Sequence, residues 1–294
     1  MSKQLYKAII LIILSAFCFA LMNMFVHLAG DLPAVQKSFF RNLIAFIIAV
    51  FAMIKDRVSL KVDKKAYIPL FLRSFIGTLG ILCNFYALDR LDLADASILN
   101  KMSPFFVIIF SIIILKENIT MPQLLFVLGA LVGALFVVKP SFSNTSAPPA
   151  FIALTGGICA GFAYTMVRLL GKQGVKGVII VAVFSGFSCL FTLPFLIFNF
   201  TPMTFSQFII LICAGLSAAG GQFTITAAYT NAPAREVSVY DYTQIIFAAA
   251  LGFLVFGQVP DLLSWVGYAI IVAMAIAMFF YNKHRSEAEQ KKEV

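Results

Sequence analysis

The charged residues of this chain fall in short clusters, and the segments between these clusters are long, uncharged and apolar. The connection at 54–66 holds five lysines and arginines, whereas the next stretch, 67–88, holds only Arg73. A run of roughly 20 apolar residues is what an α-helix needs to cross a bilayer, where backbone polar groups must be bonded within the segment. Charged residues make up 12% of the chain, against about 25% in soluble domains. The pattern predicts an all-α integral membrane protein.

Clusters of charge, proline and glycine divide the chain into ten predicted transmembrane helices. Their expected ranges are 5–29, 34–54, 67–88, 94–115, 121–139, 149–170, 177–198, 206–228, 235–257 and 262–281. Pro104 and Pro194 lie inside spans, where the missing N–H and the ring should kink the helix.

Lysine and arginine concentrate in the connections that share a side with both termini, so the positive-inside rule predicts that both termini are cytoplasmic. The short loops and the lack of a soluble domain indicate a multi-pass protein of a bacterial inner (cytoplasmic) membrane.

The net charge of +9 does not indicate a nucleic-acid partner, because the basic residues lie in short loops and at the C-terminus. The five cysteines all lie in apolar runs, without a CxxC motif or a nearby histidine, and are expected to be small buried side chains. We therefore expect no cofactor and no metal ion. The expected partners are a small-molecule substrate and membrane lipid, and the protein is expected to be a monomer or a homodimer.

The sequence contains a weak internal repeat at an offset of 141 residues, which places Cys18 on Cys159, Gly80 on Gly221 and Asn100 on Asp241. Each repeat holds five spans, and an odd number means that the two halves insert with opposite orientation. The expected units are a first repeat at 1–140, a second at 149–282 and a charged cytoplasmic tail at 283–294. Inverted repeats recur in secondary transporters, where two related halves rock around a shared site near the midplane.

Two stretches of the first half and one of the second resemble the EamA-type carriers of the drug/metabolite transporter superfamily. They are RSFIGTLGILCNFYAL from Arg73, LADASILNKMSPFF with the Lys116-Glu117 that follows, and EVSVYDYTQIIFAAALGFLVFGQ from Glu236. The resemblance covers nearly the whole chain, although Gln258 stands where family members commonly have Glu. It implies ten helices in two inverted repeats and transport of small metabolites. It leaves the substrate open among amino acids, nucleoside-like compounds, cofactors and drugs.

Polar side chains inside spans are costly in a bilayer, so they are candidates for a central site. We predict a cavity with Asp241, Tyr240, Gln244 and Tyr164 on one wall and Asn100, Asn84, Arg73 and Asn23 on the other, together with His27 and Gln222.

The deep charges of the spans are unbalanced, because Arg41, Arg73 and Lys101 face one deep anion, Asp241. This imbalance favours a secondary transporter for a small polar or amphipathic metabolite that bears a carboxylate, amino-acid-like or cofactor-like. Asp241 is also the candidate carrier of a coupling proton, and export is favoured over import.

Several of these residues also have a structural interpretation. His27 and Arg168 lie close enough to helix ends to reach the interface, Glu236 lies near a helix start where a carboxylate complements the dipole, and the glycines favour close packing.

The alternative from another class is an intramembrane aspartyl-type enzyme, because Tyr240-Asp241 resembles the Tyr-Asp pair of such proteases. That chemistry needs a second carboxylate close by, and the repeat partner of Asp241 is Asn100. HExxH, GxSxG and phosphate-loop motifs are absent as well. The chain is therefore not expected to be an enzyme.

Overall fold

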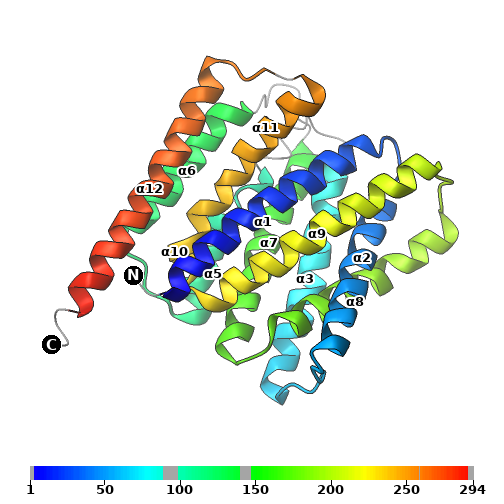
Figure 1. Ribbon diagram of the computed structural model, residues 1–294, viewed down its shortest axis with the longest axis horizontal. Coiled ribbons are helices and arrows are strands. Elements are labelled where there is room, and N and C mark those ends of the chain that lie inside the picture. Colours follow the sequence, from blue (N-terminus) through cyan, green and yellow to red (C-terminus); the bar gives the residue numbers. More distant parts are fainter. Residues whose placement is uncertain (1–2, 89–98, 140–146, 258, 291–294) are drawn as a thin grey trace.

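The computed structural model describes residues 3–88, 99–139, 147–257 and 259–290. The described part of the chain is a bundle of helices and contains no strand (Figure 1). The first half holds α1 (Lys3–Leu28), α2 (Ala34–Lys55), α3 (Lys64–Leu88), α5 (Ser103–Leu115) and α6 (Met121–Val138). The second half holds α7 (Ala147–Lys172), α8 (Gly177–Phe198), α9 (Phe205–Asn231), α10 (Ala234–Val237), the 3-10 turn η2 (Ser238–Tyr242), α11 (Thr243–Phe256) and α12 (Leu262–Gln290).

The all-helical membrane fold predicted from the sequence is confirmed. Within the described ranges, nine helical segments are long and apolar enough to cross a bilayer, and Ser103–Leu115 is a shorter apolar helix. The predicted starts of the spans lie within three residues of the observed ones wherever the structure describes the start. The last helix is longer than predicted and ends at Gln290, so the described part of the expected tail continues α12. Residues 89–98, which include Asp95 and the start of the predicted span 94–115, lie outside the described residues. Gln258 lies outside them as well.

Side chains at the connections fix where several helices begin. Thr120 and Gln123 form a capping box before α6, and Thr204 and Gln207 form another before α9. At the start of α12, Asp261 accepts hydrogen bonds from the N–H and the hydroxyl of Ser264 (3.0 and 2.8 Å). It also forms an ion pair with Lys139, the residue that follows α6. The bond from Lys139, followed by those from Ser264, lowers the pKa of Asp261 to about 2, so this exposed carboxylate is ionised at neutral pH.

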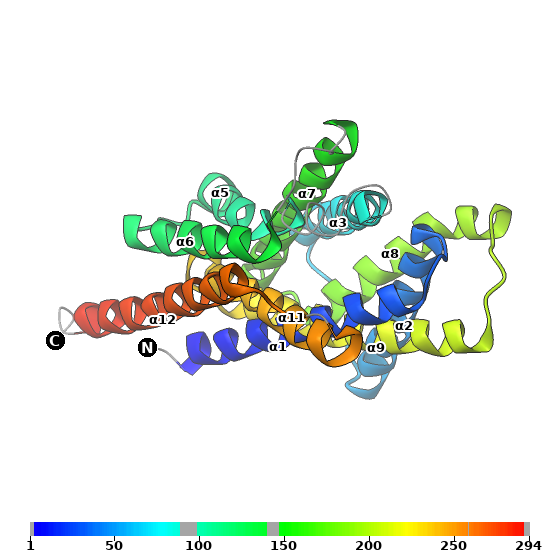
Figure 2. The ribbon, with the colours of Figure 1, turned by 90° about the horizontal axis from the view of Figure 1, so that it is seen from above.

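The helices pack in pairs that the repeat relates to one another. The contact of α1 with α9 is matched by that of α7 with α3, while α2 packs on its own repeat partner α8 and α6 on its partner α12. Viewed from above, α2 and α8 lie on one side and α6 and α12 on the other, with α1, α3, α7 and α11 between them (Figure 2). The two halves therefore interlock through a central layer. The free ends of the first and last helices lie at the same end of the molecule (Figure 1).

Glycines bring the helices of this central layer close together. A Cβ added at Gly80 of α3 would come 3.0 Å from the Cβ of Cys159 on α7, and one at Gly220 of α9 would come 3.1 Å from the Sγ of Cys18 on α1. Such small-residue contacts are the usual means of close helix packing in membranes, where the hydrophobic effect does not drive helices together. In both interfaces a cysteine that the repeat aligns thus lies against a glycine of the neighbouring helix.

Two spans are broken at equivalent places. In the first half the helical turn at 99–100 stops at Lys101 and Met102, and α5 begins at Ser103 with Pro104 in its first turn. In the second half the expected helix 235–257 is divided by the 3-10 turn η2, which contains Asp241. Because the repeat places Asn100 on Asp241, the two breaks are repeat partners. Broken helices are also where transporters of this general architecture place their binding groups.

Candidate functional site

A cavity of about 110 Å³ lies in the central layer, between the two helix breaks and the middle of α1, α2, α3, α7 and α9. Its polar and charged lining residues are Asn23, Arg41, Arg73, Asn84, Asn100, Lys101, Ser103, Tyr164, Gln222, Asp241 and Gln244.

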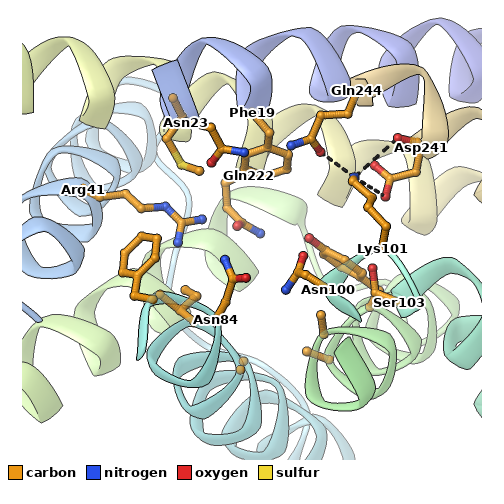
Figure 3. A pocket seen from close by; sticks show the side chains of 18 of the residues that line it. Phe19, Asn23, Arg41, Asn84, Asn100, Lys101, Ser103, Gln222, Asp241 and Gln244 are labelled. Atoms are coloured by element: carbon orange, nitrogen blue, oxygen red, sulfur yellow. Dashed lines mark hydrogen bonds and ion pairs between the residues drawn. The ribbon is translucent and has the colours of Figure 1, made fainter. Parts of the chain in front are cut away.

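Lys101, at the first break, contacts the second break at one side of the cavity (Figure 3). Its Nζ donates to Gln244 Oε1 at 2.6 Å and to Asp241 Oδ2 at 3.2 Å, and it lies 3.5 Å from the backbone carbonyl of Asp241. Lys101 and Asp241 are both buried, and a buried ion pair of this kind is sustained only when further hydrogen bonds satisfy its polar atoms. Gln244 and the carbonyl supply these bonds. We call Lys101, Asp241 and Gln244 the break cluster.

Arg41 approaches the cavity from α2, and its guanidinium group points between Asn84 and Gln222 (Figure 3). The residue is buried and its Nε has no hydrogen-bond partner. The guanidinium carbon lies 6.0 Å from the ring centre of Phe19, within the range of a cation–π contact. No carboxylate among the described residues pairs with Arg41.

Arg73 approaches from α3 and is buried more deeply still. Its guanidinium carbon lies 3.9 Å from the ring centre of Phe184 and 5.9 Å from that of Tyr164. A Cβ at Gly77, one turn later on α3, would collide with the guanidinium group, so this glycine provides the space in which the side chain lies. Like Arg41, Arg73 has a buried Nε without a partner and no ion pair with any described residue.

Amide side chains occupy the space between the cations. Asn84, Asn100 and Gln222 extend toward the middle of the cavity (Figure 3). The side-chain nitrogen of Gln222 is buried without a hydrogen-bond partner. Unpartnered buried donors are costly in a folded protein, so the Gln222 amide and the two guanidinium groups are poised to bind acceptor oxygens.

Beyond Tyr164, a ring stack and a group of polar contacts around Glu117 close one end of the central layer. The ring of Tyr164 stacks on that of Tyr229, with ring centres 5.3 Å apart. Next along α7, Arg168 binds Glu117 at 3.1 Å and donates to the carbonyl of Thr230 at 3.2 Å. Lys172 also binds Glu117, at 2.9 Å. Glu117, which the family resemblance singled out, thus links the connection after α5 to the end of α7.

The structure brings eight of the ten predicted contact residues to the cavity and leaves two outside it. The eight are Asn23, Arg73, Asn84, Asn100, Tyr164, Gln222, Asp241 and Gln244. Tyr240 lies in the hydrophobic core, because the 3-10 turn rotates it away from Asp241, and its hydroxyl has no described partner. His27 is exposed near the end of α1 and contacts the ring of Phe256 edge-on at 5.2 Å.

Sequence reasoning missed the aromatic rings that hold the two arginines, and it did not pair Lys101 with Asp241. The chain has 32 phenylalanines, and nothing in the sequence distinguishes Phe19 and Phe184 from the rest. The depth of Arg41 and Lys101 in their spans was the available signal for the cations. In the described ranges, no group of three or more His, Cys, Asp or Glu residues could hold a metal ion.

Comparison with known proteins agrees with the fold and with the repeat. The model of the EamA-like transporter family matches residues 6–139 and again residues 147–280. The pseudopaline exporter CntI of Pseudomonas aeruginosa strain UCBPP-PA14 is 33% identical over 276 residues, which cover 93% of this chain and 96% of the relative. A riboflavin transporter of Brucella anthropi is 23% identical, with 88% and 93% covered. Human solute carrier family 35 member G1 is 27% identical, with 89% and 75% covered.

A solved crystal structure has the same fold, with a TM-score of 0.81 at 15% sequence identity over 95% of this chain and 98% of the other. The predicted resemblance to the drug/metabolite transporter superfamily is thereby confirmed, and so is the expectation that the chain is not an enzyme, since the family and these relatives are transporters. Because two successive family matches span nearly its whole length, this chain is a multi-pass membrane transporter that belongs to the EamA-like transporter family.

Proposed function

We propose that this protein is a secondary transporter that exports a small metabolite with at least two acidic groups by alternating access. The observation that carries the proposal is the pair of buried arginines, Arg41 and Arg73, which face one cavity without a carboxylate partner among the described residues. Asp241, the carboxylate of the described lining, is already bound to Lys101. The lining therefore keeps two positive charges that the protein does not neutralise.

The geometry of the arginines favours recognition of carboxylates over a purely packing role. Each guanidinium group lies near an aromatic ring, with its carbon 6.0 Å from the ring centre of Phe19 for Arg41 and 3.9 Å from that of Phe184 for Arg73, and each has a buried Nε without a hydrogen-bond partner. A free planar edge is suited to binding a carboxylate with two parallel hydrogen bonds. An arginine that served packing alone would need protein acceptors for these donors, because a buried unpaired charge costs several kcal/mol.

The rest of the lining suits a small polar molecule of an amino-acid-like or cofactor-like kind. Asn84, Asn100 and Gln222 offer both donors and acceptors, which can bind hydroxyl, amine or amide groups. The similarity to an exporter of pseudopaline supports export, and the similarity to a riboflavin transporter supports a metabolite as substrate.

An inside-negative membrane potential also favours export of an anion, by about 2.3 kcal/mol per charge per 100 mV. Asp241 is the proposed carrier of a coupling proton, which is a second contribution to the driving force. Cytoplasmic termini and a bacterial inner membrane belong to the same proposal.

The experiment is transport of acidic metabolites by purified protein in liposomes, with substrates chosen from a thermal-shift screen of amino acids, di- and tricarboxylates, nucleosides, polyamines and cofactors. We expect acidic compounds to stabilise the protein and to be transported. Arg41→Gln and Arg73→Gln should each lower the ratio of kcat to KM by about ten- to a hundredfold, because each removes a charge-assisted hydrogen bond worth about 1.5–3 kcal/mol.

Arg57→Gln is the matched control, because Arg57 is exposed in the connection between α2 and α3, away from this cavity. Selective stabilisation and transport of cationic compounds such as polyamines would refute the proposal. An imposed proton gradient tests the coupling role in the same liposomes. Transport that ignores the gradient, in the wild type and in Asp241→Asn alike, would remove the proton from the mechanism.

A further inference from the structure

The break cluster contains an ammonium group whose hydrogen-bonding capacity is filled from inside the protein. Lysine has three N–H donors, and Lys101 has three oxygens near its Nζ, all of them from Asp241 and Gln244. Lys101 belongs to the first half of the chain and its acceptors to the second. The cluster is thus both a neutralised cation and a tie between the two helix breaks.

Lys101 nevertheless lines the same cavity as the two unpaired arginines. The described lining therefore holds three cations and one carboxylate, and that carboxylate lies on Lys101 rather than on Arg41 or Arg73. A substrate with two acidic groups can pair with both arginines and leave the cluster intact. A third acidic group of a substrate can pair with Lys101, provided that Asp241 releases the Lys101 ammonium group.

We propose that Lys101 is a third anion-binding group of the cavity, and that Asp241 is an internal counter-ion which a third acidic group of the substrate replaces. This inference rests on the proposed function and specifies its substrate class as metabolites with three acidic groups. Replacing one carboxylate by another at the same buried ammonium leaves that charge neutralised throughout. The displaced Asp241 carboxylate loses its cation, and the coupling proton proposed for it neutralises the group, so that neither side chain is left as an uncompensated buried charge.

The exchange also links binding to movement. When a substrate carboxylate pairs with Lys101, the bonds from Lys101 to Asp241 and Gln244 are broken. The two halves then lose this contact between their helix breaks. The two helix breaks can then separate at a lower cost in free energy, and only a three-acid substrate has this effect. Asp241 and Gln244 act here as positioning residues, whereas Lys101 contacts the substrate.

The structural alternative is that the Lys101–Asp241 ion pair only stabilises the two breaks. Under that alternative, removing the carboxylate weakens the fold and lowers the affinity for every ligand alike. Under the proposal, removing the carboxylate frees Lys101, so the affinity for a three-acid ligand rises while that for the matching two-acid ligand changes little. The two interpretations thus predict opposite changes.

Glutarate and tricarballylate form a suitable pair of probes, because tricarballylate is glutarate with one more carboxylate on its central carbon. Their dissociation constants are measured by titration calorimetry on the full chain in lipid nanodiscs, for the wild type, Asp241→Asn, Lys101→Met and the double variant. We expect Asp241→Asn to bind tricarballylate about tenfold or more tightly than the wild type, as for one charge-assisted hydrogen bond gained, with a change of less than about threefold for glutarate. The double variant should lose this gain.

Glu117→Gln is the control for loss of a buried carboxylate, because Glu117 binds two cations outside the cavity. It should leave the ratio of the two dissociation constants unchanged even if the melting temperature falls. The inference is overturned if Asp241→Asn binds tricarballylate no more tightly than the wild type, if it shows no binding at all, or if the double variant keeps the gain.

The proposed function is tested separately by the glutarate arm with Arg41→Gln and Arg73→Gln. Glutarate binding that depends on both arginines, without a gain for tricarballylate in Asp241→Asn, overturns the inference and leaves the proposed function standing. A dissociation constant for glutarate that is unchanged in Arg41→Gln and Arg73→Gln counts against the proposed function itself.

Discussion

At the scale of single residues, the site depends on aromatic rings that hold cations in place without neutralising them. Phe19 lies beside Arg41, and Phe184 and Tyr164 lie beside Arg73. A cation–π contact is worth about 0.5–2 kcal/mol, too little to offset the burial of a guanidinium group but sufficient to fix its orientation. The arginines are therefore ordered before a substrate arrives, which lowers the entropic cost of binding.

Gly77 provides a test of this arrangement, because a methyl group at this position would occupy the space of the Arg73 guanidinium group. We expect Gly77→Ala to lower transport by about tenfold or more, as a displacement of about 1 Å in a binding group can do. The melting temperature should change little, since the preference of a helix for alanine over glycine, about 1 kcal/mol, offsets part of the cost of displacing Arg73 and crowding Phe184.

Gly177→Ala is the matched control for this substitution, because a Cβ at Gly177 would meet only one methyl group of Thr226, at 3.4 Å. Its transport rate should equal that of the wild type. A transport rate for Gly77→Ala that matches the control would show that the position of Arg73 does not matter.

At the scale of elements, α7 supports the first helix break through two glycines one turn apart. A Cβ at Gly157 would come 2.6 Å from the carbonyl oxygen of Leu99, and one at Gly161 would come 2.6 Å from the Cβ of Phe106. The backbone on both sides of Lys101 therefore lies directly against α7. This contact fixes the position from which Lys101 reaches Asp241 and Gln244.

We predict that Gly161→Ala destabilises the protein by about 1–3 kcal/mol, the usual cost of inserting a group into a packed interface. The substitution should also weaken binding, because α5 must move away from α7 and Lys101 moves with it. Thermal unfolding in detergent, together with calorimetry against glutarate and tricarballylate, measures both effects. An unchanged melting temperature would mean that α5 and α7 are not packed as described.

At the scale of the whole molecule, the repeat arranges the helices so that each half completes the other. The packing of α1 on α9 and of α3 on α7 places residues of both halves around one cavity. The repeat could be predicted from the sequence because its alignment pairs Cys18 with Cys159 and Gly80 with Gly221, and the opposite orientation of the halves because each holds five spans, an odd number.

The orientation of the molecule in the membrane is a further prediction at this scale. The free ends of the first and last helices lie at one end of the bundle (Figure 1), and lysines and arginines crowd the connections that share their side. We expect a C-terminal green fluorescent protein fusion to fluoresce, alkaline phosphatase at the C-terminus to be inactive, and alkaline phosphatase after residue 200 to be active. The reverse pattern would place the termini outside the cytoplasm.

The spans, most of the polar lining and a disruption of the helix near Pro104 could be predicted from sequence, whereas the break in the second half and the pairing of charges could not. The stretch SVYDY contains neither proline nor glycine, so its local sequence does not predict the 3-10 turn that contains Asp241. Its position follows from contacts with the other half, in particular with Lys101. The pairing of Lys101 with Asp241 likewise depends on how deeply α5 lies against α7, which is a property of the packed glycines and not of either charged segment.

The break cluster also makes the two halves of the molecule unequal. In a carrier with two identical halves, a two-fold rotation would convert the state open to one side into the state open to the other. The two states would then have the same free energy. Here the repeat partners of Lys101 and Asp241 are Tyr242 and Asn100, so the ion pair has no counterpart under exchange of the halves. The two states of the empty protein therefore differ in free energy, and one of them is more populated than the other. The direction of net flow is set by the gradients across the membrane.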